Sequence, residues 1–379
     1  MWIYLILVAI IFLDFGLEFV VNKKIVADSK LKKILNFIFK FRLISVLALV
    51  IISTFRCYSV GADTLNYRIE FENFKSLSIK DCFASSRFEI GYLLTTMIIA
   101  KIGLSFRFVI LLSSLFTAYC FIRFIKEFSP NKCMSIVMFV GLGLFAQSLN
   151  IIRHIIALDF VLLSIILLFK NKIFKSIILV LIASLFHVTA LVAILFVGFK
   201  YLKLSYPLLI IIITTAVVGI FIFPYAMKFI EQITPLNFYT QYFVVQKYKF
   251  YAEPGLIDNL YSIALTVIFI VLLLARKYLT ELNEQEKKHY DFYLIVYLFV
   301  PLIRLAGFVL KAQSLLNRLN VYFFFALIIL LPMFLKGFKL NKNFKFIAVG
   351  ASYIIILCYM YYFYAIQDPN GVVPFSWVF

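Results

Sequence analysis

An arginine and a histidine stand side by side in an otherwise apolar stretch that runs from Asn150 to Ala157. At helical spacing Asn150, Arg153, His154 and Ala157 share one face. A charged group inside a membrane segment is costly and is a functional candidate by default. An arginine presents a fixed fork of donors that suits phosphate oxygens. The stripe therefore predicts a pocket for an anionic group, and the alternative is an arginine at a helix end that reaches the lipid headgroups.

His187 is the second candidate, because it lies in the middle of an apolar stretch of some two dozen residues. A neutral imidazole accepts a proton near neutral pH. We expect a functional histidine, and the alternative is a residue that only packs within a helix.

A polar segment from Arg56 to Tyr67 is the third candidate, and Glu89 and Tyr92 follow it closely. Gly61 permits a tight turn, and Asp63 is placed to cap a helix that begins at Thr64. In that helix Asp63, Tyr67 and Glu70 would align at positions i, i+4 and i+7. These residues have either a catalytic or substrate-binding role or a structural one, as a helix cap and an interfacial aromatic.

Two cations come late in the chain. Arg304 lies inside the apolar segment 291–310, and Arg318 opens a helix that we expect on the outer side of the membrane. Arg318 is expected to meet Arg153 across the helical bundle.

The elements that position these residues must be membrane helices. Hydrophobic residues make up 64% of the 379 residues and charged ones 15%, whereas soluble domains are typically about half apolar and a quarter charged. The apolar runs are continuous rather than alternating, which favours helices over a barrel. We predict a polytopic all-α protein with about 10–12 transmembrane helices in a single membrane domain, 1–379. The apolar segments are 1–21, 36–55, 89–104, 107–125, 133–149, 155–169, 174–199, 205–230, 257–275, 291–310, 319–335 and 344–364.

The Lys-rich loops 22–33, 276–290 and 336–345 are predicted to be cytoplasmic. The loops 56–88, 231–256 and 311–318 and the tail 365–379 then lie outside. Placing the Lys-bearing turns 123–132 and 170–175 inside requires two segments between 89 and 230 to be re-entrant or half-spanning, and 89–104 is the best candidate. The net charge of +19 indicates contact with anionic membrane lipids and not with nucleic acid.

Several motifs are missing from the sequence. It has no Walker lysine motif, no H-E-x-x-H, no G-x-S-x-G and no metal-ligand spacing among its cysteines. An ATP-driven pump and a zinc protease are therefore disfavoured, and we expect neither a metal nor a cofactor.

The order of the motifs resembles the EpsG-type branch of the Wzy polysaccharide polymerases, over roughly residues 50–377. Two positions depart from the family pattern, since His154 stands where the family usually has Gln, and Phe375 replaces a Tyr after Pro374. The motifs that carry the resemblance are Gly61-x-Asp63-x-x-x-Tyr67, Glu89-x-Gly91-Tyr92, Asn150-x-x-Arg153-x-x-x-Ala157, Phe186-His187-x-Thr189-Ala190-Leu191, Arg318 and Pro374-Phe375-Ser-Trp377.

The resemblance implies a membrane glycosyltransferase with a GT-C-like architecture in the bacterial inner membrane, its active site facing the outside. Its substrates would be oligosaccharide repeat units on undecaprenyl diphosphate, without a nucleotide sugar, and a chain-length regulator protein is a candidate partner. Arg153 and Arg318, with Arg304 or Arg56, would hold the diphosphate. The base would be His187, His154, Asp63 or Glu89.

Outer-loop aromatics are expected to stack on sugars: Tyr58, Tyr67, Tyr92, Tyr239 and Tyr242. The competing functions are a flippase for lipid-linked sugars, an O-antigen ligase and, less well matched, a membrane acyltransferase.

Overall fold

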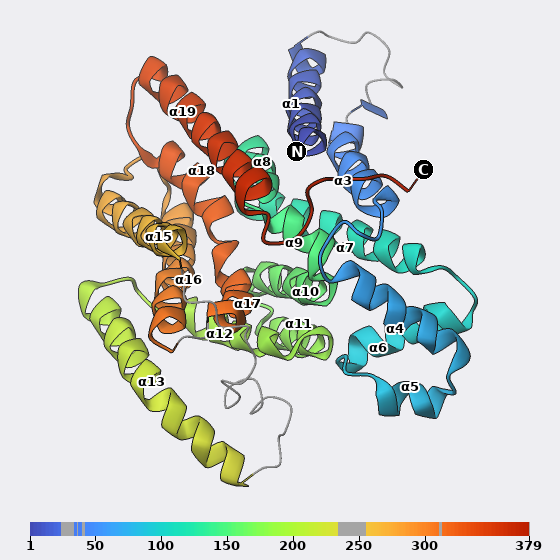
Figure 1. Cartoon of the computed structure of the whole chain (residues 1–379). Coiled ribbons are helices and arrows are strands. Elements are labelled where there is room, and N and C mark those ends of the chain that lie inside the picture. Colours follow the sequence, from blue (N-terminus) through green and yellow to red (C-terminus); the bar gives the residue numbers. More distant parts are fainter. Residues whose placement is uncertain (24–33, 36, 40–41, 234–254, 311–312, 379) are drawn as a thin grey trace. The chain divides into compact units, whose positions relative to one another are not determined.

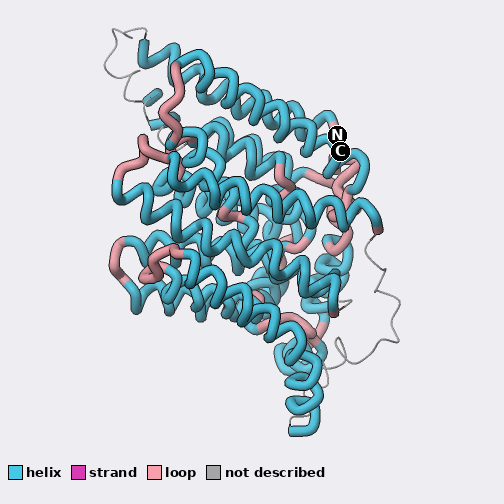
Figure 2. Tube along the Cα trace, turned by 90° about the vertical axis from the view of Figure 1, so that its left-hand side faces the viewer, coloured by secondary structure: helices cyan, strands magenta, loops and turns pink. Residues whose placement is uncertain are grey.

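Helices make up nearly all of the computed structural model, which describes residues 1–23, 34–35, 37–39, 42–233, 255–310 and 313–378. Short loops join the helices (Figure 2), and these ranges contain no strand, only an isolated antiparallel bridge between Arg56 and Trp377. The polytopic helical fold predicted from the apolar runs is confirmed. The chain forms two compact units, Met1–Ile194 with Leu340–Phe379, and Leu195–Lys339. The prediction of one membrane domain stays a prediction.

The first unit contains most of the candidate residues, and Figure 1 labels its helices. Helices α10 and α11 pack along each other, as do α7 and α10, and α3 and α7. The helices are α1 (Trp2–Lys23), α3 (Leu43–Phe55), α4 (Thr64–Ser76), α5 (Ile79–Ser85), α6 (Ile90–Lys101), α7 (Phe106–Phe128), α8 (Lys132–Gly141), α9 (Leu144–Asn150), α10 (Ile152–Phe169), α11 (Ile173–Phe186), the 3₁₀ helix η1 (Val188–Ile194), α19 (Lys342–Tyr361) and the π-helix η3 (Tyr362–Gln367).

The second unit is built around α16, which packs against α15, α17 and α18. Within this unit the end of α18 meets the residues at the start of α16. The Glu281 N–H donates to the Gly337 carbonyl at 2.9 Å, and Lys336 pairs with Glu286. Its helices are α12 (Leu195–Phe199), α13 (Tyr206–Ile233), α15 (Leu256–Ala275), the 3₁₀ helix η2 (Arg276–Tyr278), α16 (Glu284–Val309), α17 (Gln313–Phe324) and α18 (Leu327–Gly337).

Eight helices in the described ranges are long and apolar enough to cross a membrane, or nine if the bent pair α8–α9 is one span. This count is below the predicted 10–12 because several predicted segments are short or broken helices. Helix α6 has 12 residues and is about 18 Å long, whereas the hydrocarbon core measures about 30 Å. The predicted segment 174–199 is likewise divided, since α11 ends at Phe186.

Two breaks in the helices determine where the candidate residues point. Ile151, with φ −92° and ψ 62°, separates α9 from α10, so Asn150 ends one helix while Arg153 and His154 begin the next. The expectation of one continuous helical stripe from Asn150 to Ala157 is therefore wrong. His187 has an extended backbone and caps the end of α11, so it lies at a break in the predicted apolar segment 174–199 and not within a helix.

The C-terminal tail is bound to the loop between α3 and α4 through main-chain hydrogen bonds. The Gly61 N–H donates to the Gly371 carbonyl at 2.7 Å, and the Cys57 N–H donates to the Ser376 carbonyl at 2.8 Å. Gly61 has φ +95°, and a Cβ there would lie 2.4 Å from the Leu149 carbonyl oxygen. A glycine is therefore required where this turn meets the end of α9.

Candidate active site

Glu89 lies at the centre of a cluster drawn from three helices of the first unit. It occupies the N-cap position of α6, and its Oε1 is 2.7 Å from Nδ1 of His187 at the end of α11. Its other oxygen, Oε2, accepts a hydrogen bond from Nη1 of Arg153 on α10. The side chains of the three residues are 14–18% exposed. One carboxylate therefore bridges the two residues that the sequence singled out separately.

A close approach between α6 and α11 permits this contact. Gly91, in the first turn of α6, faces the last turn of α11, and a Cβ there would lie 2.7 Å from the Leu185 carbonyl oxygen. Glycine therefore lets the two helix ends meet, so that Glu89 reaches His187.

A second histidine adjoins this cluster. The rings of His154 and His187 have centroids 4.3 Å apart, and His154 is only 3% exposed. His154, which stands where the family pattern has Gln, thus lies against His187, the histidine that contacts Glu89.

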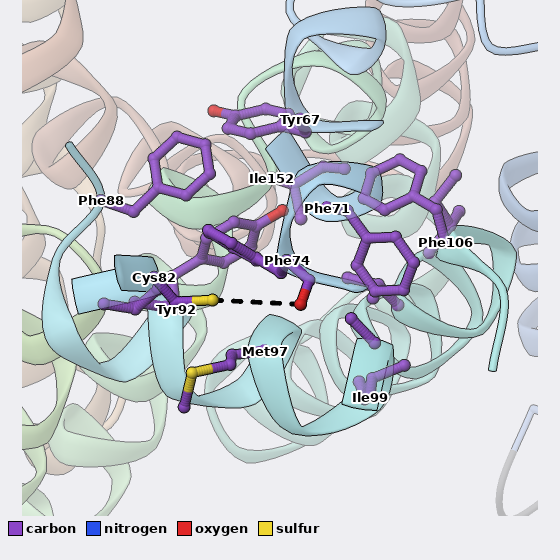
Figure 3. Packing of buried hydrophobic residues seen from close by; sticks show 14 of the residues in the cluster. Tyr67, Phe71, Phe74, Cys82, Phe88, Tyr92, Met97, Ile99, Phe106 and Ile152 are labelled. Carbon is purple, nitrogen blue, oxygen red and sulfur yellow. Dashed lines mark hydrogen bonds between the residues drawn. The ribbon is translucent and has the colours of Figure 1, made fainter. Parts of the chain in front are cut away.

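Two aromatic rings lie against one side of the Arg153 guanidinium. Its carbon lies 4.6 Å from the centroid of Phe88 and 5.8 Å from that of Tyr67. Tyr67, Phe88 and Tyr92 contact one another, with centroids 5.1–5.6 Å apart, at one edge of a buried apolar cluster that also contains Phe71. Figure 3 shows these rings close to one another. The packed rings exclude water from one side of the guanidinium, which strengthens its electrostatic interactions.

The charge state of Glu89 follows from its partners. Burial raises the pKa of Glu89, but the hydrogen bond with His187 and the charge of Arg153 outweigh burial, so that the pKa lies below its ordinary value. Glu89 is therefore ionised at neutral pH and only accepts hydrogen bonds. Because the carboxylate can only accept, the contact with Glu89 assigns the N–H of a neutral His187 to Nδ1 and leaves Nε2 as its acceptor nitrogen.

Asn150 and Asp63 form a separate junction. The Asn150 Oδ1 accepts the Asp63 N–H at 2.7 Å, and its Nδ2 donates to Oδ1 of Asn370 in the tail at 3.2 Å. Helix α4 begins at Thr64 as predicted, although the Asp63 side chain makes no capping hydrogen bond. Asn370, which the sequence did not point to, thus joins the tail to Asn150 and through it to Asp63.

Arg56 is built into the fold. It is 1% exposed, and its guanidinium donates to the carbonyls of Val60 at 3.2 Å, of Leu149 at 2.9 Å and of Ser53. Its donors join the end of α3, the following loop and the end of α9. This arrangement gives Arg56 a structural role rather than a place in the cluster around Glu89.

Arg304 and Arg318 belong to the second unit. Arg304 is 5% exposed and donates to Ser262 at 3.0 Å, to Asn317 at 2.8 Å and to the Asp258 carbonyl at 3.2 Å. Arg318 is exposed. The expected meeting of Arg318 with Arg153 stays a prediction.

The aromatic residues proposed to stack on sugars are placed differently. Tyr67 is 6% and Tyr92 1% exposed, so both rings stack on protein side chains. Tyr58 lies beneath two guanidinium groups, those of Arg68 at 4.3 Å and Arg107 at 4.8 Å. Tyr239 and Tyr242 lie outside the described residues, as does most of the predicted outer loop 231–256.

A metal was not expected from the sequence. Within the part of the chain that the structure describes, no group of three or more His, Cys, Asp or Glu side chains is placed to hold a metal ion.

The chain was compared with models of known protein families. The model of the EpsG family matches residues 39–377. The chain belongs to the EpsG family. The matched region contains Glu89, Arg153, His154 and His187. Membership of the EpsG family indicates a glycosyltransferase-like membrane protein of the polysaccharide polymerase type. Searches of curated proteins and of solved structures returned no match.

Proposed function

We propose that the protein polymerises a polysaccharide at the outer face of a bacterial inner membrane. It would transfer a growing glycan from undecaprenyl diphosphate to a hydroxyl of the next lipid-linked repeat unit, without a nucleotide sugar or a metal. The observation that carries the proposal is the bridge that Glu89 makes between His187 and Arg153. The transfer benefits from a base for the acceptor hydroxyl and from a cation for the departing diphosphate, and one carboxylate holds both candidates together here.

The transfer makes one bond and breaks one. The acceptor hydroxyl oxygen attacks the anomeric carbon of the donor glycan, and the bond from that carbon to the diphosphate oxygen breaks with its electron pair. Undecaprenyl diphosphate leaves as an anion. His187 takes the proton of the acceptor hydroxyl on Nε2, while Nδ1 remains hydrogen-bonded to Glu89. The carboxylate keeps the imidazole in the tautomer that the reaction needs.

The charge of the cluster changes in step with the reaction. The proposed base must be neutral before transfer, and the charges of Arg153 and Glu89 then cancel, so that the three residues carry no net charge. When His187 accepts the proton, the cluster becomes cationic as the diphosphate becomes anionic. A positive charge that develops together with the negative charge on the diphosphate stabilises the transition state more than it stabilises the ground state. Arg153 therefore acts in this proposal without an unpaired positive charge in the resting protein.

The packing of the loops supports a common outer surface. The tail and the loop after α3 are bound together, as two segments on one side of a membrane must be. Helix α6 is too short to span, and α11 ends at Phe186; both agree with the two incomplete segments that the positive-inside arrangement requires. The proposed site then lies where these incomplete helices end.

The test is a polymerisation assay on Arg153→Ala and His187→Ala, each expressed at the wild-type level. We expect both variants to lose long-chain polymer on a gel, because one lacks the cation and the other the base. Lys170→Ala is the matched control, since Lys170 pairs with Glu127 at 3.2 Å in the same unit but away from the cluster. Polymer of normal length in both variants would remove the proposal.

Purified wild-type protein distinguishes the competing functions. A polymerase in nanodiscs lengthens a lipid-linked repeat unit without any other protein. A flippase moves that substrate without lengthening it, and a ligase requires a different acceptor.

A further inference from the structure

We infer that a groove beside the cluster, lined by α4 and by the segment that leads to Glu89, is a binding site for the glycan part of the substrate. The groove has a volume of about 300 Å³, at the lower end of the range for small-ligand pockets. Asn66, Glu70, Asn73 and Arg87 are its polar lining residues. The inference rests on the proposed function, because it assigns the groove to the same substrate.

Helix α4 presents an ordered row of polar groups to the groove. Asn66, Glu70 and Asn73 are at positions i, i+4 and i+7, so they lie on one face of the helix. In the part of the chain that the structure describes, neither asparagine amide has a hydrogen-bond partner. Each amide offers two donors and one acceptor, which suits the hydroxyls of a sugar, themselves both donors and acceptors.

The charged groups of the groove compensate each other. Nε of Arg87 lies 3.7 Å from Oε2 of Glu70, and Glu70 is also held by the Ser86 hydroxyl at 2.8 Å. The lining therefore carries one positive and one negative charge. A phosphate would meet the carboxylate as well as the guanidinium, whereas a neutral, hydroxyl-rich ligand is compatible with both.

Apolar atoms complete the groove. Ile69 and Leu77 line it together with the polar residues, and Ile69 is 54% exposed. The C–H faces of a sugar ring pack on such side chains while its hydroxyls reach the amides.

The position of the groove connects it to the site of transfer. Arg87 precedes Glu89 by two residues, and Tyr67, which contacts Arg153, lies on α4 one turn from Glu70. A glycan held in the groove is therefore anchored by segments that lie within a few residues of Glu89 and of the ring that contacts Arg153. Such an anchor keeps a growing chain on the protein between transfers, and it should raise the number of units added before release.

The experiment measures binding apart from transfer. Full-length protein in nanodiscs is titrated with a fluorescently labelled soluble oligosaccharide, a single repeat unit released by hydrolysis of the cell's own polysaccharide. We expect Asn66→Ala/Asn73→Ala to weaken binding at least tenfold and to give shorter polymer, with a higher KM but an unchanged kcat. Asn73→Ala alone should have a smaller effect in the same direction.

The matched control is Glu72→Ala, because Glu72 lies on the same helix, pairs with Lys75 at 2.7 Å and does not line the groove. This variant should bind the oligosaccharide as the wild type does. The inference is overturned if the wild type does not bind the oligosaccharide, if the double variant binds within twofold of the wild type, or if Glu72→Ala loses as much.

The outcome that refutes the polymerase differs from the outcome that refutes the groove. A wild-type protein that binds the oligosaccharide through Asn66 and Asn73 but never lengthens a lipid-linked unit supports the groove and refutes the polymerase. A protein that polymerises normally with both asparagines replaced refutes the groove and leaves the polymerase in place.

Discussion

Replacing Glu89 by Gln is the most direct perturbation of the cluster. The amide has nearly the shape of the carboxylate but no charge, so it no longer compensates Arg153 or stabilises a protonated His187. It also offers an N–H donor, which allows the imidazole to bind in the wrong tautomer. The substitution therefore disturbs the proposed base and the cation together while changing little of the packing.

The magnitude follows from the geometry. The contact of 2.7 Å between Glu89 and His187 has the length of a charge-assisted hydrogen bond, and the side chains are 17% and 14% exposed, so water screens it weakly. A positioned base typically contributes about 10²–10⁴ in rate, equivalent to about 2.7–5.4 kcal/mol of activation free energy. We expect Glu89→Gln to slow transfer by a factor in that range.

The assay is the initial rate of repeat-unit addition by purified protein in nanodiscs, at saturating lipid-linked substrate. It includes Glu89→Gln, His187→Ala and the double variant. If Glu89 acts largely through His187, the loss in the double variant should be clearly smaller than the sum of the two single losses, with only the effect on Arg153 remaining, because residues that act as a unit are not additive. Glu127→Gln, which removes the charge of a carboxylate paired with Lys170, is the control and should keep the wild-type rate.

Two results would refute this reasoning. A Glu89→Gln rate within threefold of the wild type would mean that the carboxylate does not support the base. Fully additive losses in the double variant would mean that Glu89 and His187 act independently.

Further predictions concern stability and can be measured as melting temperatures. Arg56→Lys should cost about 2–4 kcal/mol, because a compact ammonium cannot donate to three carbonyls at once. Gly61→Val should unfold the loop against α9, since φ is +95° and a Cβ would lie 2.4 Å from a carbonyl oxygen. The pKa of Glu89 is lowered in the folded protein, so its charge stabilises the fold above the ordinary pKa of about 4.3. The difference in melting temperature between wild type and Glu89→Gln should thus shrink as the pH falls below about 4, where Glu89 becomes protonated.

Local patterns in the sequence predicted local features well. The turn at Gly61 and the start of a helix after Asp63 depend on the backbone preferences of a few adjacent residues, and both occur in the structure. The sequence also identifies Arg153, His154 and His187 as candidate functional residues, because ionisable groups are rare in apolar segments. Their roles, however, could not be read from spacing within one segment.

The apolar runs predict uninterrupted helices, and the structure differs from that prediction at two points. Nothing in the apolar runs, which lack proline at these points, marked the breaks at Ile151 and His187. The groove was also missed, although Asn66, Glu70 and Asn73 share a helix face. That spacing was a usable signal, but Arg87, which completes the groove, lies beyond the next helix.

The sequence alone determined that this chain is a helical membrane protein, because the free energy of burying its apolar segments depends on composition and length. It also determined which polar residues are costly to bury. Only the tertiary structure decided that Glu89 joins Arg153 to His187, that Arg56 is bound to backbone carbonyls and that Asn370 reaches Asn150. These pairings connect residues 64 to 220 positions apart, and the packing of whole helices, rather than any local preference, brings such residues together.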